Sequence, residues 1–288
     1  MNALQDLRFD AVFDVAIESS IEWLNDNFAF FFDTLRTGLD GALFALNWAL
    51  GFPWPIFIVL TALACWRLSG WGLALFSVIS LVLCWQADLW EMLIETLALV
   101  LLATLIALAI AIPLGIAGAR WSRLGKALEP VMDTLQTLPP YVYLLPAIAL
   151  IGYGGASAVM ATMVLAVPPS VRLTMLGMRH IPVERIELSQ SLGARPLPEL
   201  FKVRIPSAMP SIMAGVNQSL MMALGMAVIA GIIGADGLGG EVYRAIRYLE
   251  VGRAMDAGLA IVVISILLDR LSVGAAAAFM SHGGDHGR

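Results

Sequence analysis

The side chains best suited to covalent or metal chemistry are few and scattered in this sequence. The three histidines are His180 and, four residues apart near the end of the chain, His282 and His286. Two histidines at that spacing can share a metal ion, but the glycines around them are more typical of a flexible chain end. We therefore expect no metal site and no catalytic residue, and we expect residues 280–288 to form a flexible cytoplasmic tail.

A nucleotide site of the phosphate-loop type is not expected either. That loop needs two glycines separated by four residues, followed by a lysine and then a serine or threonine. The one Gly-Lys pair, Gly125–Lys126, is followed by Ala127. The sequence therefore predicts no cofactor bound to this chain and no ATP hydrolysis by it.

Polar side chains that could contact a passing solute gather beside prolines. Prolines interrupt long apolar runs at Pro139–Pro140, at Pro146 and at Pro168–Pro169. Each proline removes a backbone donor, and such breaks are tolerated in lipid only where protein or a water-filled cavity satisfies the backbone. Helix kinks with hydrogen bonds between helices would explain the same residues equally well. Our hypothesis is a translocation path lined by Gln136, Thr137, Pro139, Pro140, Tyr141, Tyr143, Asn217 and Gln218.

The elements that position these residues must lie in lipid. Hydrophobic residues make up 59% of the 288 positions and charged residues 14%, against roughly 45–50% and about 25% in soluble domains. A soluble fold of this size would expose large apolar patches. The apolar runs are continuous rather than alternating, which favours helices over a β-barrel. The sequence therefore predicts an all-α integral membrane protein.

Seven apolar runs approach the length of about 20 residues that a helix needs to cross a bilayer. The first two runs, within residues 52–87, are short and tightly connected, so a re-entrant hairpin is an alternative for them. The third run is too long to span upright and contains Pro113, which predicts a kink. Six tryptophans fall at the ends of these runs, as interfacial anchors do: Trp54, Trp66, Trp71, Trp85, Trp90 and Trp121. The predicted spans are residues 52–66, 71–85, 89–119, 131–153, 156–178, 209–234 and 255–279.

The distribution of lysine and arginine orients the predicted spans. With the N-terminus outside, the cytoplasmic segments hold 11 of these residues and the outside segments hold 5. Because cytoplasmic loops are enriched in Lys and Arg, we expect the N-terminus outside and the C-terminus inside. A chain without charge at mid-membrane is a poor ion-coupled secondary transporter. The charged residues within the spans are expected toward helix ends, and they are Asp133, Arg172, Asp256, Asp269 and Arg270.

Residues 1–51 differ from the rest of the chain. The first fifty residues contain eight acidic and two basic side chains. Apolar residues recur at helical spacing from Phe13 to Phe28, beside acids that repeat every four residues from Asp10 to Asp26. This pattern is typical of an amphipathic helix, which we expect to lie on the outer, periplasmic surface of the membrane.

Small residues recur every four positions along the sixth predicted span, at Gly215, Ser219, Ala223 and Ala227. In membranes such a stripe lets two helix backbones approach closely. It predicts a close-packing face, either within the chain or at the axis of a dimer.

The long segment 179–207 between the fifth and sixth predicted spans has a helix–turn–helix pattern. Residues 186–192 are predicted to be helical, and Gly193 can adopt the left-handed conformation that ends a helix. Pro196 suits the first turn of a second short helix, which we expect Pro206 to limit. Such a motif can bind DNA, but the lipid-bound context excludes nucleic acid as a partner. The second helix combines apolar and basic side chains, Leu200, Phe201 and Val203 beside Lys202 and Arg204.

The spacing of this segment resembles a family of membrane proteins. Glu187 is followed six residues later by Gly193, then by nine residues and the sequence V-R-I-P that ends at Pro206. This resembles the E-A-A-x-x-x-G-x9-I-x-L-P loop of ATP-binding-cassette importer permeases, with Leu188 and Ser189 in place of the two alanines. The resemblance implies a coupling helix that sits in a groove of a cytoplasmic ATPase. The residues it implicates are Glu187, Leu188, Ser189, Gly193, Ala194, Leu200, Phe201, Val203, Ile205 and Pro206.

Longer segments narrow the resemblance to permeases of glycine betaine/proline betaine uptake systems. They are residues 133–146, 166–174, 202–224 and 266–271. The likeness implies a type I importer permease core over residues 88–279, located in a bacterial inner membrane.

The same resemblance implies the partners of the chain. They are a cytoplasmic ATPase that holds ATP and Mg, a periplasmic or external solute-binding protein, membrane lipid and a second copy of the permease. The implied solutes are glycine betaine, proline betaine or choline. The alternatives are an ion-coupled secondary transporter and a channel for small solutes.

Overall fold

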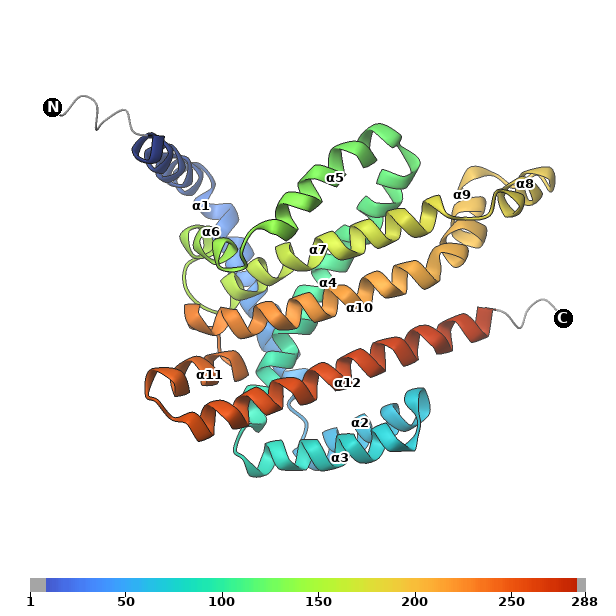
Figure 1. Cartoon of the computed structure of the whole chain (residues 1–288). Coiled ribbons are helices and arrows are strands. Elements are labelled where there is room, and N and C mark those ends of the chain that lie inside the picture. The colour runs from blue at the N-terminus through green and yellow to red at the C-terminus, as the bar shows by residue number, and fades with distance from the viewer. Residues whose placement is uncertain (1–8, 284–288) are drawn as a thin grey trace.

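The computed structural model describes the backbone of residues 9–283 and the side chains of residues 14–278. Within that part of the chain every regular element is helical (Figure 1). The elements are α1 Phe9–Leu50, α2 Trp54–Ser69, α3 Trp71–Gln86, α4 Trp90–Arg120, α5 Ser122–Thr137, α6 Tyr141–Ile151, α7 Gly155–Arg179, α8 Val183–Ser191, α9 Pro196–Glu199, the π-helix η1 Leu200–Arg204, α10 Ile205–Ala230, the 3-10 turn η2 Gly231–Ile233, α11 Leu238–Arg247 and α12 Val251–Gly283.

The described helices include four that are individually long and apolar enough to cross a membrane. They are α4, α7, the continuous stretch Pro196–Ile233 that contains α10, and α12. Two bent pairs, α1 with α2 and α5 with α6, raise the number of candidate spans to at most six. The all-helical prediction is confirmed, whereas the number of candidate spans is smaller than the predicted seven.

The fourth predicted span is not one continuous helix. Residues 131–153 are divided between α5 and α6, which meet at an angle of 98°. Pro139 and Pro140 stand between the two helices. Pro139 and Pro140 supply no backbone donors and disfavour helical backbone in the preceding residue, and α5 ends before them, whereas the pair Pro168–Pro169 lies inside the continuous helix α7.

The first two predicted spans form a helical hairpin. Each of α2 and α3 has 16 residues, a length of about 24 Å, which is shorter than the roughly 30 Å core of a bilayer. Gly70, with φ +97°, turns the chain between them. At the other end of the hairpin the rings of Trp54 and Trp85 stack with their centroids 4.3 Å apart. The hairpin packs on α12 (Figure 1).

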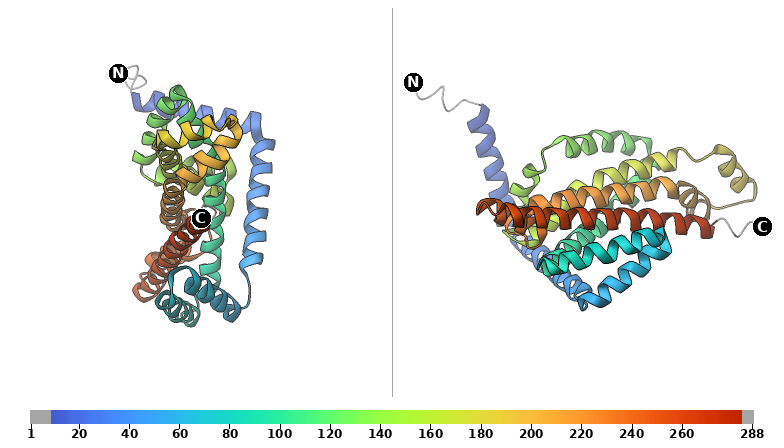
Figure 2. Two further views of the ribbon diagram at one scale, coloured as in Figure 1. Left: turned by 90° about the vertical axis from the view of Figure 1, so that its right-hand side faces the viewer. Right: turned by 60° about the horizontal axis from the view of Figure 1, so that its bottom comes forward.

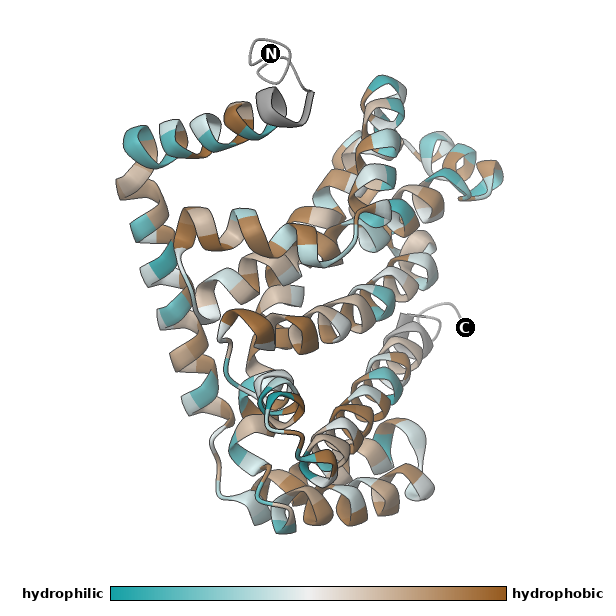
Figure 3. Cartoon of the chain, turned by 60° about the vertical axis from the view of Figure 1, so that its left-hand side comes forward, coloured by the Kyte–Doolittle hydropathy of each residue, from teal (hydrophilic) through white to brown (hydrophobic). Residues whose placement is uncertain are grey.

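Helix α1 crosses one end of the bundle and meets α2 at an angle of 86° (Figure 2). It bends at Phe28. Asn25 Nδ2 donates to the carbonyl of Ala149 at 2.9 Å, and Asp40 Oδ1 accepts from the amide of Ala156 at 3.1 Å. The helix therefore lies across the α6–α7 connection, and hydrophilic and hydrophobic residues alternate along it (Figure 3). The expectation that this segment is an amphipathic helix on the outer, periplasmic surface of the membrane stays a prediction.

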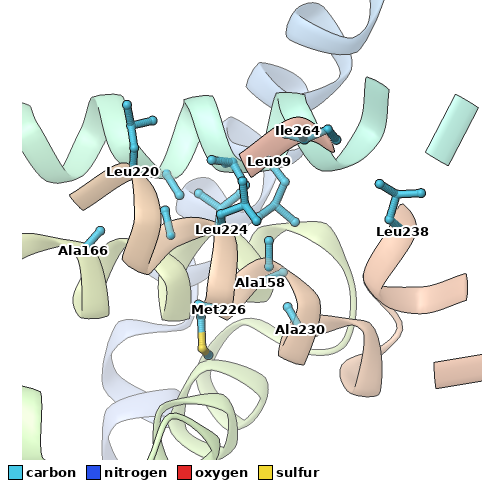
Figure 4. Packing of buried hydrophobic residues seen from close by; sticks show 14 of the residues in the cluster. Leu99, Ala158, Ala166, Leu220, Leu224, Met226, Ala230, Leu238 and Ile264 are labelled. Carbon is cyan, nitrogen blue, oxygen red and sulfur yellow. The ribbon is translucent and has the colours of Figure 1, made fainter. Parts of the chain in front are cut away.

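The core lies where α7 packs against α4 and α10 (Figure 4). The predicted stripe of small residues on α10 is buried there, since Ser219 and Ala223 have no exposed surface. Ser219 Oγ donates to the carbonyl of Ala166 on α7 at 2.6 Å. A methyl group on Gly215 would approach Ser170 Cα to 3.1 Å. The close-packing face is therefore confirmed, and it is used within the chain rather than at a dimer axis.

Candidate functional site

The segment between α7 and α10 forms a projecting lobe at the opposite end of the bundle from the α6–α7 connection (Figures 1 and 2). Its first helix, α8, ends where the sequence predicts. Gly193 has φ +77°, its amide donates to the carbonyl of Gln190 at 2.9 Å, and the amide of Ala194 donates to the carbonyl of Ser189 at 3.0 Å. These two bonds form a Schellman motif, which satisfies the last carbonyls of α8 and fixes the turn.

The second helix of the lobe begins as predicted but does not end at Pro206. Helix α9 starts at Pro196, continues through η1 and runs directly into α10, whose first turn contains Pro206. In a regular α-helix the ring of Pro206 would clash with the carbonyl of Lys202. The wider π-helical turn, in which the amide of Ile205 donates to the carbonyl of Leu200, relieves this clash. The expectation that Pro206 limits the helix is therefore wrong.

A buried carboxylate holds the two halves of the lobe together. Glu199 is 6% exposed, and its Oε1 accepts a 2.6 Å hydrogen bond from Nε of Arg204. Its Oε2 accepts from Nε2 of Gln190 on α8 at 3.3 Å. The hydrogen bond from Arg204 lowers the pKa of the Glu199 carboxyl. These three residues, the Glu199 cluster, fix α8 against η1.

The sequence analysis did not find the Glu199 cluster. Glu199 and Arg204 are five residues apart, a spacing that does not place side chains together on an α-helix. They meet because the backbone between them is π-helical. The available signal was the proline at position 206, which forces that distortion.

The residues predicted for the lobe differ in how far they are exposed to solvent. Ser189 is buried, and Leu200 and Ile205 pack against the apolar cluster at the base of the lobe. Ala194 and Val203 are half-buried, whereas Glu187 and Pro206 are exposed. The lobe also exposes large apolar side chains that we call the apolar edge: Leu188, Leu192, Leu197 and Phe201, between 62% and 79% exposed.

Two members of the apolar edge, Leu188 and Phe201, were predicted from the sequence, and Leu192 and Leu197 were missed. The latter two flank the turn at Gly193, which brings the end of α8 and the start of α9 into one lobe. Four exposed apolar side chains on one projecting lobe form the kind of surface that proteins use to bind a partner.

The residues predicted to line a translocation path form two separate groups. The first group lies at the break between α5 and α6: Gln136, Thr137, Pro139, Pro140, Tyr141 and Tyr143. The hydroxyl of Tyr143 donates to the carbonyl of Leu135 across this break. An ion pair between Asp133 and Arg172 joins α5 to α7 one turn away. One side-chain hydrogen bond therefore bridges the break between α5 and α6.

The second group, Asn217 and Gln218, lies on α10. Both line a cavity of about 570 Å³ between α7, α10 and α12. Asn217 Nδ2 donates to Asp269 Oδ1 at 3.0 Å, and Ser272 Oγ donates to Asn217 Oδ1 at 2.5 Å. Helix α7 contacts both α5 and α10 and lies between the two groups (Figure 1). The structure therefore divides the predicted residues between two polar surfaces, and their role in a translocation path stays a prediction.

Asp269 corrects the sequence analysis. It was expected toward a helix end, but its partner Asn217 is the thirteenth of the 26 residues of α10. A carboxylate within a membrane-spanning helix requires a polar partner. Here the amide of Asn217 supplies that partner, and the carboxylate joins α12 to α10.

The other end of the bundle has a buried ion pair of its own. Glu241 on α11 is 5% exposed, and its carboxylate accepts from Arg253 Nε at 2.5 Å and from Arg244 Nη1 at 2.8 Å. Arg253 also donates to the carbonyl of Ala87, between α3 and α4, at 2.7 Å. This arrangement connects α11, α12 and the α3–α4 turn, and the sequence analysis did not predict it.

Comparisons with known proteins place this geometry in context. The sequence profile of the family described as "Binding-protein-dependent transport system inner membrane component" matches residues 111–279. The chain is 42% identical over 260 residues to the glycine betaine/proline betaine transport system permease protein ProW of Escherichia coli (strain K12), covering 90% of this chain and 73% of the relative.

A second relative matches over nearly its full length. The glycine betaine transport system permease protein OpuAB of Bacillus subtilis (strain 168) is 37% identical over 257 residues, covering 89% of this chain and 91% of the relative. Among solved structures, one described as inward-facing conformations of the MetNI methionine ABC transporter matches with a TM-score of 0.60 at 21% sequence identity. The match covers 68% of this chain and 95% of that chain, and it shows a shared fold.

Proposed function

The chain belongs to the inner-membrane components of binding-protein-dependent transport systems, and from this premise we propose that it carries glycine betaine and related quaternary ammonium solutes. It is a multi-pass permease subunit of the inner membrane. One observation carries the solute assignment. The likeness to two betaine permeases extends over about nine-tenths of this chain, and the family match over residues 111–279 includes both polar surfaces and the lobe.

The lobe between α7 and α10 is proposed as the contact with a cytoplasmic ATPase, which would hold the ATP and Mg. Its apolar edge supplies a surface that is unfavourable in water, and a groove in the partner would bury it. Two features keep the lobe in one shape, the Schellman motif at Gly193 and the Glu199 cluster. A rigid lobe can transmit a displacement, whereas a flexible one would absorb it.

The path of that displacement is built into α10. Because η1 runs into α10 without a break, a movement of the lobe is passed along one helix to Asn217. Asn217 holds Asp269, so the movement also reaches α12. We propose that this connection links ATPase closure to the cavity that Asn217 and Gln218 line.

The remaining partners follow from the same proposal. A solute-binding protein would approach the end that carries α11, and two permease chains would combine their polar surfaces around one solute. The Lys and Arg distribution supports an N-terminus outside and a C-terminus inside. The ATPase and binding-protein partners are properties that the family implies, and the homodimer is our proposal.

Uptake into proteoliposomes tests the proposal. The chain is reconstituted with the ATPase and the binding protein of its own system, with ATP on the side of the ATPase. Labelled glycine betaine, proline betaine and choline are compared with and without ATP. We expect ATP-dependent uptake of at least one of these solutes. ATP-independent uptake that follows an ion gradient would contradict the proposal and favour coupling through Asp269.

A further inference from the structure

A second cavity lies between the tip of the α2–α3 hairpin and α12. Its volume is about 480 Å³. The hairpin contributes Ser69, Gly72 and Phe76, and α12 contributes Arg270 and Val273. The two elements are held together beside it, because Ser69 Oγ donates to the carbonyl of Arg270 at 3.2 Å. The cavity is therefore a built feature of the hairpin–α12 contact, and it adjoins the cavity at Asn217, with which it shares Val273 and Ala277.

The cavity combines a cation with apolar walls. Phe76, Ile266 and Val273 are 37%, 37% and 49% exposed around it. Arg270 has a side chain that is 63% exposed, and the nearest oxygen of its neighbour Asp269 is 3.8 Å away. Asn217 binds the other oxygen of that carboxylate, Oδ1. At 3.8 Å the Arg270–Asp269 contact is longer than a hydrogen bond, so the guanidinium, with its five N–H donors, has capacity to bind an anion.

The position of the cavity along the bundle determines what surrounds it. The hairpin tip lies at the same end of the bundle as the lobe between α7 and α10 (Figures 1 and 2). Trp66 and Trp71 flank the tip and are 59% and 72% exposed, as expected for side chains at a bilayer interface. A guanidinium among apolar side chains at this depth is costly unless it meets an anion or water.

We propose that this cavity binds an anionic phospholipid of the cytoplasmic leaflet. The lipid phosphate would accept hydrogen bonds from the Arg270 guanidinium, which matches phosphate geometry in a bidentate way. The acyl chains would lie against Phe76, Ile266 and Val273. Basic pockets between helices on the cytoplasmic side are suited to anionic headgroups. The lipid would thereby attach the short hairpin to α12.

Retention of lipid by the purified full-length chain tests this assignment. The chain is reconstituted in bilayers that contain phosphatidylglycerol and phosphatidylcholine in equal amounts, and bound lipid is counted by native mass spectrometry after mild extraction. We expect phosphatidylglycerol to be retained in preference to phosphatidylcholine. Arg270→Gln should weaken that retention about fivefold, the effect of one arginine near a membrane surface.

Two further variants distinguish the effect of the Arg270 charge from the effect of the shape of the cavity. Gly72→Leu keeps the cation but places a side chain in the cavity, where a Cβ has nothing within 4 Å, so it should also displace the lipid. Arg123→Gln removes an exposed arginine of α5 that does not line the cavity, and it should leave retention unchanged. Monodisperse elution and unchanged thermal unfolding establish that each variant is folded.

Three results would overturn the proposal. One is equal retention of the two lipids, because a neutral headgroup would then fill the cavity as well. Another is unchanged phosphatidylglycerol retention in both Arg270→Gln and Gly72→Leu. The third is a crosslink from a Gly72→Cys variant to a second copy of the chain, which would assign the cavity to a protein interface.

Discussion

Replacing Gly193 by alanine should weaken the binding of the ATPase subunit without adding a steric clash. Gly193 has φ +77°, and a Cβ built on it meets nothing within 4 Å. The effect of the substitution is therefore conformational. An L-residue in the left-handed region costs about 1–2 kcal/mol, which corresponds to a factor of roughly 5–30 in a population ratio.

The mechanism of this loss is a shift in the unbound lobe. Alanine disfavours the Schellman turn, so the lobe geometry that fits the ATPase becomes a minor state, and the apparent affinity falls by its population. The assay is the dissociation constant between the ATPase subunit and the permease in nanodiscs. We expect a Kd about 5–30-fold higher for Gly193→Ala, and a smaller rise for Gly193→Asn, because asparagine tolerates the left-handed region.

The matched control is Gly252→Ala in the first turn of α12, where a Cβ also meets nothing within 4 Å and no positive φ is required. That variant should bind the ATPase as the wild type does. Equal affinities for wild type and Gly193→Ala would refute the reasoning. An asparagine variant that binds worse than the alanine variant would also refute it, since side-chain size rather than backbone conformation would then decide.

Three further predictions concern the packing and charge of the chain. Gly215→Ala should lower the free energy of unfolding in detergent by about 1–3 kcal/mol, because its methyl group would crowd Ser170, whereas Gly225→Ala, with open space around the Cβ, should not. Arg253→Ala should lower the free energy of unfolding by about 3 kcal/mol or more, since it leaves the buried Glu241 carboxylate short of a partner. Arg244→Ala should lower it by less than about 1 kcal/mol, because the Arg244 side chain is 62% exposed. Thermal unfolding of the two variants measures this difference. Glu199 has a lowered pKa, so its cluster contributes stability above the ordinary glutamate pKa of about 4.3 and loses that stability as the pH falls through the lowered value. The amide hydrogens of residues 190–204 should therefore be protected from exchange at neutral pH. Equal protection in Glu199→Gln would contradict this.

The parts of the fold that were predictable are those that depend on local sequence. Apolar composition and run length predicted an all-helical membrane protein, and Gly193 predicted the end of α8 because left-handed backbone favours glycine. The small-residue stripe on α10 predicted close helix packing. Each of these predictions depends on residue types and on their near neighbours in the sequence.

The parts that were missed depend on contacts between distant segments or on a distorted backbone. Asp269 has its polar partner in Asn217, which is 52 residues away in the sequence. The Glu199–Arg204 pair forms only because Pro206 widens the preceding turn. The angle between α5 and α6 is also not encoded by composition, since prolines indicate that a helix ends but not the direction of the next one.

The measurement that tests the central claim most directly is uptake per ATP hydrolysed in proteoliposomes. Wild type is compared with a Glu187→Ala, Gly193→Pro double variant in complexes that contain the ATPase and the binding protein. Proline fixes φ near −65° where the lobe requires +77°, and it removes the amide that bonds Gln190. We predict ATP-dependent uptake by the wild type, with at least about a tenfold fall in uptake per ATP in the folded variant. Wild-type uptake that ignores ATP, or a variant with normal uptake per ATP, would contradict the assignment of the lobe as the coupling element.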